Sequence, residues 1–194
     1  MLYMHTPNGR NQHALALGAE FEIMKLAVTV TSQGAGHAIR GAAQLSTIAR
    51  IDTRGAVVRN ISRTMQRMRW LINGESFRMN RYPIQSRGNT AGLWDIQNAE
   101  MSMPHPMHMH GFSFQVVSRL NSPNQVRKLA QDASGRLVTY LGWKDTILVW
   151  PGENVRIAID FTHAHKGDQL YQFPCHNLEH EDQGMMVNHR VTAV

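Results

Sequence analysis

A two-residue hydrophobic period restricts the fold of this chain more than any other feature. In the segment VRIAIDF at 155–161, apolar residues occupy every second position, and Arg156 and Asp160 stand between them. Successive side chains of a β-strand point to opposite faces, so this segment is predicted to be a half-buried strand. Segments 112–119 and 145–150 are rich in β-branched and aromatic residues and are predicted to be strands as well.

Turn residues separate the predicted strands. Asn73-Gly74 suits a tight hairpin after the segment RWLI, and Pro151-Gly152 marks a turn between two of the strands. Short strands at such spacing, without alternating helices, predict an all-β fold in which antiparallel sheets pack as a sandwich. The apolar fraction of 42% is sufficient for a hydrophobic core.

The first part of the chain differs from the rest. Residues 19–30 have the pattern of one strong strand, whereas 31–47 are small, polar and glycine-rich, as in a linker. We therefore expect residues 1–45 to be the tail of a preceding domain plus a linker, and residues 46–194 to form one domain. The sequence shows neither an apolar run of membrane-spanning length nor a signal peptide, and its single cysteine excludes an intrachain disulfide.

The chain is basic, with a formal net charge of +6. Arg59, Arg63 and Arg67 recur at helical spacing, and a phosphate-binding stripe is one interpretation of them. A solvated arginine-rich surface is the alternative. We favour the solvated surface because neither a nucleic-acid motif nor an interleaved aromatic platform accompanies the arginines. Nucleic acid is therefore not an expected partner.

One segment near the C-terminus carries metal-binding side chains. Cys175, His180 and Met185 recur at intervals of five residues within YQFPCHNLEHEDQGMMVNHRV. A copper site that cycles between Cu(I) and Cu(II) uses a thiolate and two imidazoles in a trigonal set, with a distant axial thioether. The segment supplies this set except for one imidazole. Taken singly, a buried cysteine packs as a small hydrophobe and a methionine fills core space, and these are the alternatives.

The stretch HPMHMHG at 105–111 contains further imidazoles. In an extended chain His108 and His110 project from the same face. We expect Pro106 to fix the local backbone and to take His105 out of that alternation. Zinc is one alternative, because it also accepts cysteine and histidine, but it gains nothing from a thioether. A cupin, a β-barrel that binds metal through a His-x-His pair, is another, but the glutamate that usually follows such a pair is missing here. The residues therefore favour copper.

The other histidines and the methionines around the first motif lack this regular spacing. A soft patch for Cu(I) is one interpretation of the methionines, but we favour the filling of gaps in the core. These methionines are Met101, Met103, Met107 and Met109. The other histidines are expected on the surface or in loops, and they are His5, His13, His37, His163, His165 and His189.

The segments HPMHMHGFSFQVVSR and CHNLEHEDQGMM resemble the C-terminal copper motifs of the multicopper oxidases, the family of laccases, bilirubin oxidases and cuprous oxidases. The resemblance extends to LINGESFRMNR, GLWDIQNAEMSMPHPMH and GWKDTILVWPGENVRI, and covers roughly residues 57–194. It implies a cupredoxin-like Greek-key β-sandwich, the final domain of a three-domain bacterial enzyme. Residues 1–45 would then end a preceding cupredoxin domain.

The resemblance also implies copper ligands. His105, Cys175 and His180 would bind a type 1 copper, with Met185 as the axial ligand. In this family the type 1 copper accepts an electron from a reducing substrate. The electron then passes through the cysteine to imidazoles on the neighbouring residues, which hold a trinuclear copper cluster where O₂ is reduced.

A second set of residues is similar to ligands of that cluster. His108 matches a type 2 ligand, and His110 and His176 match type 3 ligands. Glu181 matches an acidic residue that feeds protons toward oxygen, which makes chemical sense because reduction of O₂ to water consumes protons. A solvated or capping acid in the segment EHED is the alternative for Glu181.

Pro174 departs from the usual His-Cys-His motif of the family. Proline has no donor atom in its side chain, so one type 3 ligand is absent. The family supplies further cluster histidines from an N-terminal domain. Outside the motifs above, this chain has only one such pair, His163 and His165, in a polar segment that is expected to be a loop. The chain alone is therefore not expected to complete a trinuclear cluster.

The implied activity is copper-dependent oxidation of phenols, related aromatic compounds or Cu(I), coupled to reduction of O₂. The implied partners are a small-molecule reductant, O₂ and N-terminal cupredoxin domains in the same protein or in a separate chain, while homo-oligomer formation stays open. The resemblance implies a periplasmic or extracellular location. Two alternatives remain: a stand-alone type 1 copper electron-transfer module, and a degenerate cupredoxin that serves as a scaffold.

Overall fold

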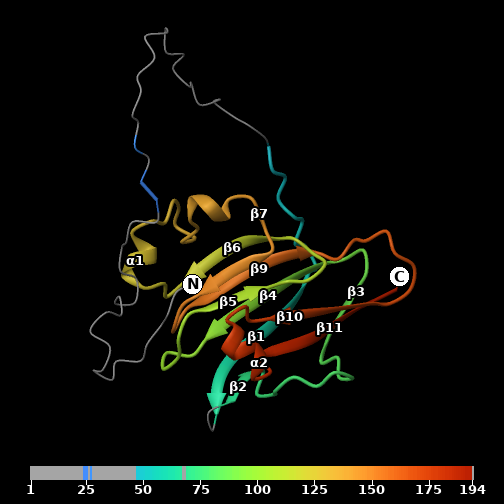
Figure 1. Cartoon of the computed structure of the whole chain (residues 1–194). Coiled ribbons are helices and arrows are strands. Elements are labelled where there is room, and N and C mark those ends of the chain that lie inside the picture. Colours follow the sequence, from blue (N-terminus) through green and yellow to red (C-terminus); the bar gives the residue numbers. More distant parts are fainter. Residues whose placement is uncertain (1–23, 26, 28–46, 67–68, 194) are drawn as a thin grey trace. The chain divides into compact units, whose positions relative to one another are not determined.

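The computed structural model describes residues 24, 25, 27, 47–66 and 69–193 (Figure 1). The chain divides into two units after Ile48, and the strands and helices of the described residues all lie in the second unit, 49–194. Except for residues 24, 25, 27 and 47, the predicted strand at 19–30 and linker at 31–47 lie outside the described residues. No described helix is long and apolar enough to cross a membrane.

Short β-strands make up most of the second unit. In chain order they are β1 Val57–Gln66, β2 Arg69–Ile72, β3 Ile84–Arg87, β4 Ala91–Asn98, β5 His105–His108, β6 Phe114–Leu120, β7 Trp143–Lys144, β8 Thr146–Val149, β9 Asn154–Asp160, β10 Gln169–Pro174 and β11 Met186–Thr192. The helical segments are α1 Asn124–Arg127, the 3₁₀ turn η1 Val138–Tyr140 and α2 Leu178–Asp182.

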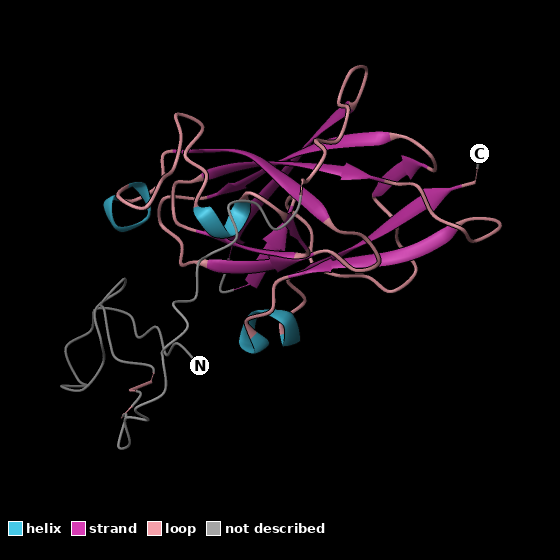
Figure 2. Ribbon diagram, turned by 90° about the horizontal axis from the view of Figure 1, so that it is seen from above, coloured by secondary structure: helices cyan, strands magenta, loops and turns pink. Residues whose placement is uncertain are grey.

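The strands form three sheets that pack as two layers. One layer is a six-stranded sheet in the order β2-β1-β4-β9-β6-β7, and the other combines a β10-β11-β3 sheet with a β5-β8 pair. A bridge between Met107 and Cys175 joins the two smaller sheets. Figure 2 shows the strands as two layers, and the buried core contains residues from both. This arrangement confirms the predicted all-β sandwich, but the expectation of purely antiparallel sheets is wrong, because β1 pairs with β4 and β11 pairs with β3 in parallel.

The strands and turns predicted within the second unit are present. On β9 the side chains of Val155, Ile157 and Ile159 are fully buried, as the two-residue period requires. Asn73 and Gly74 both have positive φ, 52° and 76°, which is the conformation of a tight hairpin turn whose twist matches the strands. The strand predicted at 112–119 begins two residues late, at Phe114.

Two sequence-based expectations about polar residues are wrong. The arginines do not follow a helical stripe, because Arg59 and Arg63 lie on the strand β1, while Arg67 lies outside the described residues. Alternation on β1 sends Arg63 into the core, where it is 1% exposed, so this side chain is not part of a solvated surface. His189 is not on the surface either, because it lies fully buried on β11.

A buried ion pair fixes the turn between β8 and β9 against β6. Arg119 donates two hydrogen bonds to the Glu153 carboxylate, at 2.8 and 2.7 Å, and both side chains are almost completely buried. The same carboxylate accepts a hydrogen bond from the Trp150 N–H at 3.0 Å. Each carboxylate oxygen therefore has a donor, which is the condition under which a buried charge is tolerated.

Replacement of Arg119 by methionine is expected to lower the free energy of unfolding by about 3–5 kcal/mol, because the Glu153 carboxylate would stay buried without its cation. Urea denaturation of the metal-free chain, followed by tryptophan fluorescence, measures the change. The control is Arg156→Met, which breaks the ion pair with Asp95. The Arg156 side chain is 43% exposed, so this variant is expected to lose less than about 1 kcal/mol. Equal losses in the two variants would contradict the expectation.

Candidate metal centre

Three buried side chains converge near one end of the sandwich. The Nδ1 atoms of His105 and His180 lie 3.1 Å apart, and the Cys175 Sγ lies 3.6 and 3.5 Å from them. His105 and Cys175 are fully buried, and His180 is 2% exposed. The three atoms form a nearly equilateral triangle whose centre lies about 2 Å from each corner, close to metal–nitrogen and metal–thiolate bond lengths. One thiolate and two imidazoles in a trigonal arrangement fit copper.

Helix α2 holds one side of this triangle. Asn177 caps its first turn, since the Asn177 side chain accepts a hydrogen bond from the Glu179 N–H at 3.2 Å. At the other end, Gly184 has φ of 86° and its N–H donates to the Glu181 carbonyl, while the following N–H donates to the His180 carbonyl. This pair of bonds is a Schellman motif, which favours glycine at the left-handed position. The short helix is thus closed at both ends.

Met185 connects the two ligands of this segment through its backbone. Its N–H donates to the His180 carbonyl at 2.9 Å, and its carbonyl accepts from the Cys175 N–H at 3.0 Å. The Met185 side chain is fully buried in the same core as Cys175. The spacing of five residues that marks the sequence therefore corresponds to a closed hydrogen-bonded loop.

The outer edges of the two imidazoles are covered by residues that the sequence patterns did not single out as a group. The Trp70 ring packs against both, with ring centroids 5.0 Å from His105 and 4.2 Å from His180. The His105 Nε2 lies 3.0 Å from the Ser102 Oγ, and the His180 Nε2 lies 3.1 Å from the Met103 Sδ. The spacing of residues along the sequence does not predict this contact of Trp70, because Trp70 lies on the edge strand β2, far from the histidines in the sequence.

Burial keeps the three ligand side chains neutral in the absence of a metal. It lowers the pKa of His105 to about 2, aided by the positive charges of Arg63 and His180, and lowers the pKa of His180 to about 4. Burial also raises the pKa of the Cys175 thiol to about 11, against the opposing effects of a backbone hydrogen bond from Asn177 and the charge of Arg63. A metal that binds the thiolate must therefore displace a proton.

A second, more open group of imidazoles lies beside the first. Ligand atoms of His108, His110 and His176 all lie within 4.8 Å of one another. His108 and His176 are stacked with centroids 4.8 Å apart, and the His108 Nδ1 lies 2.8 Å from the Thr146 Oγ1. Partial burial lowers the pKa of His110, with neighbouring imidazoles acting in the same direction and Glu181 opposing them.

Strand alternation separates the two groups. Cys175 and His176 are neighbours in an extended segment, so their side chains point to opposite sides. His105 and His108 are three positions apart on β5, so their side chains also point to opposite sides. The expectation that Pro106 takes His105 out of the alternation is wrong, because β5 runs through Pro106 without interruption and Pro106 pairs with a residue of β8.

Pro174 and Glu181 lie near His176. Pro174 is the last residue of β10 and is buried. It lies two positions before His176, so the two side chains are on the same side of the extended segment. A donor side chain at this position would thus face the side of the second group, but proline supplies none. The Glu181 Oε2 lies 3.2 Å from the His176 Nδ1, so this carboxylate contacts a member of the second group directly.

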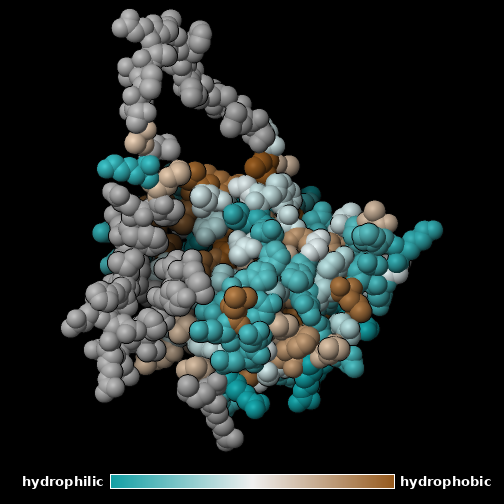
Figure 3. All heavy atoms as spheres, in the orientation of Figure 1, coloured by the Kyte–Doolittle hydropathy of each residue, from teal (hydrophilic) through white to brown (hydrophobic). Residues whose placement is uncertain are grey.

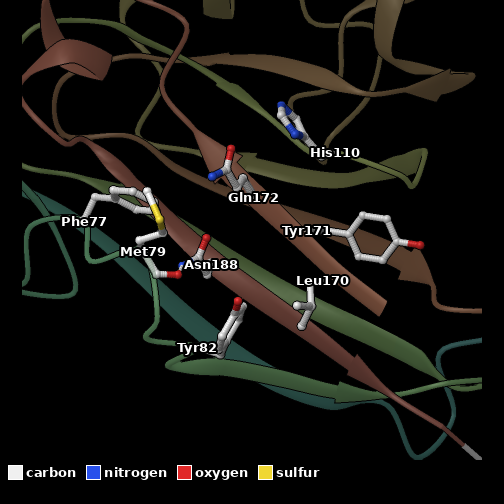
Figure 4. Close-up of a pocket in the computed structure, with 8 residues that line it drawn as sticks. All are labelled: Phe77, Met79, Tyr82, His110, Leu170, Tyr171, Gln172 and Asn188. Carbon is white, nitrogen blue, oxygen red and sulfur yellow. Dashed lines mark hydrogen bonds between the residues drawn. The ribbon is translucent and has the colours of Figure 1, made fainter. Parts of the chain in front are cut away.

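A hollow of about 340 Å³ opens beside His110 (Figure 4). Strand β10 contributes Leu170, Tyr171 and Gln172, and the close-up shows His110 at one end of the hollow. Gly111, which follows His110, has φ of 78°, and a Cβ atom there would lie 2.0 Å from the Tyr171 ring. Glycine is therefore required at this position for the ring to pack beside His110.

The methionines around the first motif divide into two kinds. Met107 and Met109 are buried core residues, which confirms the gap-filling role for this pair. Met101 is 93% exposed, and Met103 is partly buried against His180. On the face shown in Figure 3, hydrophobic residues form separate small groups among hydrophilic ones. The gap-filling expectation is therefore wrong for Met101, while Met103 places a soft sulfur atom against His180.

The chain is similar to proteins of one family throughout its second unit. The family model for multicopper oxidases matches residues 50–193. A multicopper oxidase of Staphylococcus aureus, Mco, is 36% identical over 124 residues, which are 62% of this chain and 24% of that protein. The bilirubin oxidase of Albifimbria verrucaria is 30% identical over 127 residues, 64% of this chain and 20% of that protein. The chain thus spans a quarter or less of these relatives.

A solved structure supports the same relationship. The McoA multicopper oxidase from the hyperthermophile Aquifex aeolicus superposes with a TM-score of 0.66 and 38% sequence identity, over 77% of this chain and 32% of that chain. This similarity confirms the predicted cupredoxin-like Greek-key fold. Because the family model covers most of the sequence and the copper motifs fall within it, this chain belongs to the multicopper oxidase family.

Proposed function

We propose that residues 46–194 are the C-terminal cupredoxin domain of a multicopper oxidase and hold its type 1 copper. The observation that carries the proposal is the buried triangle of His105, Cys175 and His180, which is linked to a second imidazole group through the peptide bond between Cys175 and His176. Copper bound in the triangle would supply one-electron redox chemistry. The preceding residues, 1–45, would end another cupredoxin domain.

The residues of the chain have distinct roles in this proposal. His105, His180 and the Cys175 thiolate would hold the copper, together with the thioether of the buried Met185. The Trp70 ring covers both imidazoles and excludes water from the ligands. Because the site is dry and preformed by hydrogen bonds, little rearrangement is needed when the charge of the site changes.

The reductant is proposed to approach the His180 edge. The His180 Nε2 points toward the Met103 sulfur, and the neighbouring Met101 is almost completely exposed. A phenol or another aromatic compound would transfer its electron at this edge, and the two thioethers would suit Cu(I) as an alternative reductant. The location proposed for the parent enzyme is periplasmic or extracellular, following the family resemblance.

The second group is proposed to be one part of an oxygen-reducing cluster. His108 would be a type 2 ligand, and His110 and His176 would be type 3 ligands. The relatives are several times longer than the matched segment, which supports the proposal that N-terminal cupredoxin domains supply the remaining histidines. Glu181, in contact with His176, would hold the proton that is delivered toward oxygen.

A second candidate function is a stand-alone electron-transfer module. It is favoured by one observation: the described residues supply all three corners of the triangle, whereas in the second group they supply three imidazoles, with a proline at position 174. A degenerate scaffold without copper is the third candidate. Visible absorption of the copper-loaded chain separates them, because an intense thiolate-to-Cu(II) band is expected for both copper functions and is absent for the scaffold. Oxygen uptake with a phenolic donor then separates the oxidase from the module.

Cys175→Ser is expected to abolish the intense band and tight copper binding, because a hydroxyl is a hard and poorly ionised replacement for a thiolate. Copper binding to the unmodified chain near pH 7 should release one proton, since the thiol with a pKa of about 11 is protonated before binding. Calorimetry in buffers of different ionisation enthalpy measures this proton. His165→Asn, an exposed control, should retain both band and proton release. A Cys175→Ser variant that stays intensely coloured would exclude the assignment.

Met185→Leu is expected to retain copper and to raise its reduction potential. The axial thioether is a long and weak ligand, so its loss costs little affinity but destabilises Cu(II) relative to Cu(I). Potentiometric titration of the absorption band measures the shift. Met186→Leu is the matched control, because Met186 is the first residue of β11 and is only partly buried, whereas Met185 is fully buried. An unchanged or lower potential in Met185→Leu would show that this residue only fills the core.

Pro174→His is not expected to create sustained oxygen reduction in the isolated chain, because one additional imidazole still leaves the cluster without the histidines of other domains. When N-terminal domains of a relative are supplied, the same substitution is expected to raise oxygen uptake, since productive chemistry depends on positioned ligands. Pro174→Ala controls for the loss of proline. Steady oxygen consumption by the isolated Pro174→His chain would contradict the fragment proposal and point to histidines shared between copies.

A further inference from the structure

Arg63 is a cation buried in the core of the sandwich. Its side chain is 1% exposed, and none of its guanidinium nitrogens has a hydrogen-bond partner among the described residues. Transfer of a charge out of water is costly unless the charge is paired and hydrogen-bonded. A buried guanidinium without hydrogen bonds lowers the stability of the domain, so packing alone does not explain why an arginine is present at this position.

The strand register connects Arg63 through Asn98 with the backbone around His105. Arg63 on β1 pairs with Asn98 on β4, and the Asn98 Nδ2 donates to the carbonyls of Met103, at 2.9 Å, and Val149, at 3.1 Å. Val149 pairs in turn with His105 across β8 and β5. The Asn98 Oδ1 also has no hydrogen-bond partner among the described residues. Arg63 is therefore separated from the His105 segment by a single side chain.

The carboxylate near Arg63 is already neutralised by another residue. Glu153 acts electrostatically on Arg63, but it forms the two-point ion pair with Arg119. The charge of Arg63 is therefore left uncompensated by this pair. Among the described residues, the other group whose negative charge raises the pKa of Arg63 is Cys175, whose thiolate forms at neutral pH when a metal displaces the thiol proton.

Arg63 stays charged at neutral pH. Burial lowers its pKa to about 9, and the charges of Cys175 and Glu153 oppose that decrease. In the other direction, Arg63 lowers the pKa of both His105 and Cys175. The cation thus acts on two of the three residues that form the triangle.

We propose that Arg63 is a positioning charge that raises the reduction potential of copper held by His105, Cys175 and His180. The inference rests on the proposed function, because it concerns the copper of that site. One electron from the reductant converts Cu(II) to Cu(I) with the same ligands, so the oxidised site carries one more positive charge than the reduced site. A nearby fixed cation repels the oxidised site more strongly and therefore favours the reduced one. Because Arg63 is buried, salt should screen this effect only weakly.

The test compares midpoint potentials of the copper-loaded full chain with those of three variants. Arg63→Met removes the charge at similar length, Arg63→Lys retains it, and Arg156→Met removes a partly exposed cation as the control. The absorption band is titrated against redox mediators at low and high salt. A lower potential in Arg63→Met at both salt concentrations is expected, with a near-normal value in Arg63→Lys and in Arg156→Met. An unchanged or higher potential in Arg63→Met overturns the proposal.

Thermal unfolding of the metal-free chains gives a second readout. Because the guanidinium is unpaired, metal-free Arg63→Met is expected to melt at the same temperature as the unmodified chain or at a higher one. A lower melting temperature, or failure to fold, would show that Arg63 supports the fold and would overturn the proposal. If the unmodified chain gives no copper band, the proposed function fails together with this inference. If it gives the band but Arg63→Met leaves the potential unchanged, this inference fails alone.

Discussion

The hydrogen bonds that Met185 makes with Cys175 and His180 are the constraint on which the candidate metal centre depends. They close a short loop that contains a capped helical turn, and so fix two ligand side chains before any metal arrives. Gly184 makes this closure feasible, because its left-handed conformation allows both bonds of the Schellman motif. The third corner, His105, comes from β5 and is held against this loop by the bridge between Met107 and Cys175.

The same short segment serves two groups because a strand presents opposite faces at successive residues. The side chain of Cys175 lies in the core, whereas that of His176 is more exposed and meets the imidazoles of His108, at the end of β5, and His110, which follows that strand. The peptide bond between Cys175 and His176 therefore connects a buried site with a solvent-exposed one. Their difference in burial matches the difference in proposed roles, since an outer-sphere electron acceptor needs exclusion of water and a substrate-binding cluster needs access.

Charges inside the sandwich are of two kinds. In the Arg119–Glu153 pair both carboxylate oxygens accept hydrogen bonds and the pair fixes a turn, although Nη1 of Arg119 has no partner among the described residues. Arg63 is different, because its guanidinium is buried among the strands and has no such partner in the part of the chain that the structure describes. Removal of the two cations should therefore affect the stability of the domain differently. Loss of Arg119 lowers it, whereas loss of Arg63 raises it or leaves it unchanged.

The sequence by itself determined the local features of this protein. Alternation predicted β9, the residue pairs Asn73-Gly74 and Pro151-Gly152 predicted turns, and the spacing of Cys175 and His180 predicted ligands that the structure brings together. These properties depend on neighbouring residues, so they can be read along the chain. Tertiary structure decided which distant residues surround the ligands. Trp70 reaches the imidazoles only because β2 lies at the sheet edge beside them, and Arg63 is buried only because β1 is a strand rather than a helix. Such contacts follow from strand pairing between remote segments, which leaves no local pattern in the sequence.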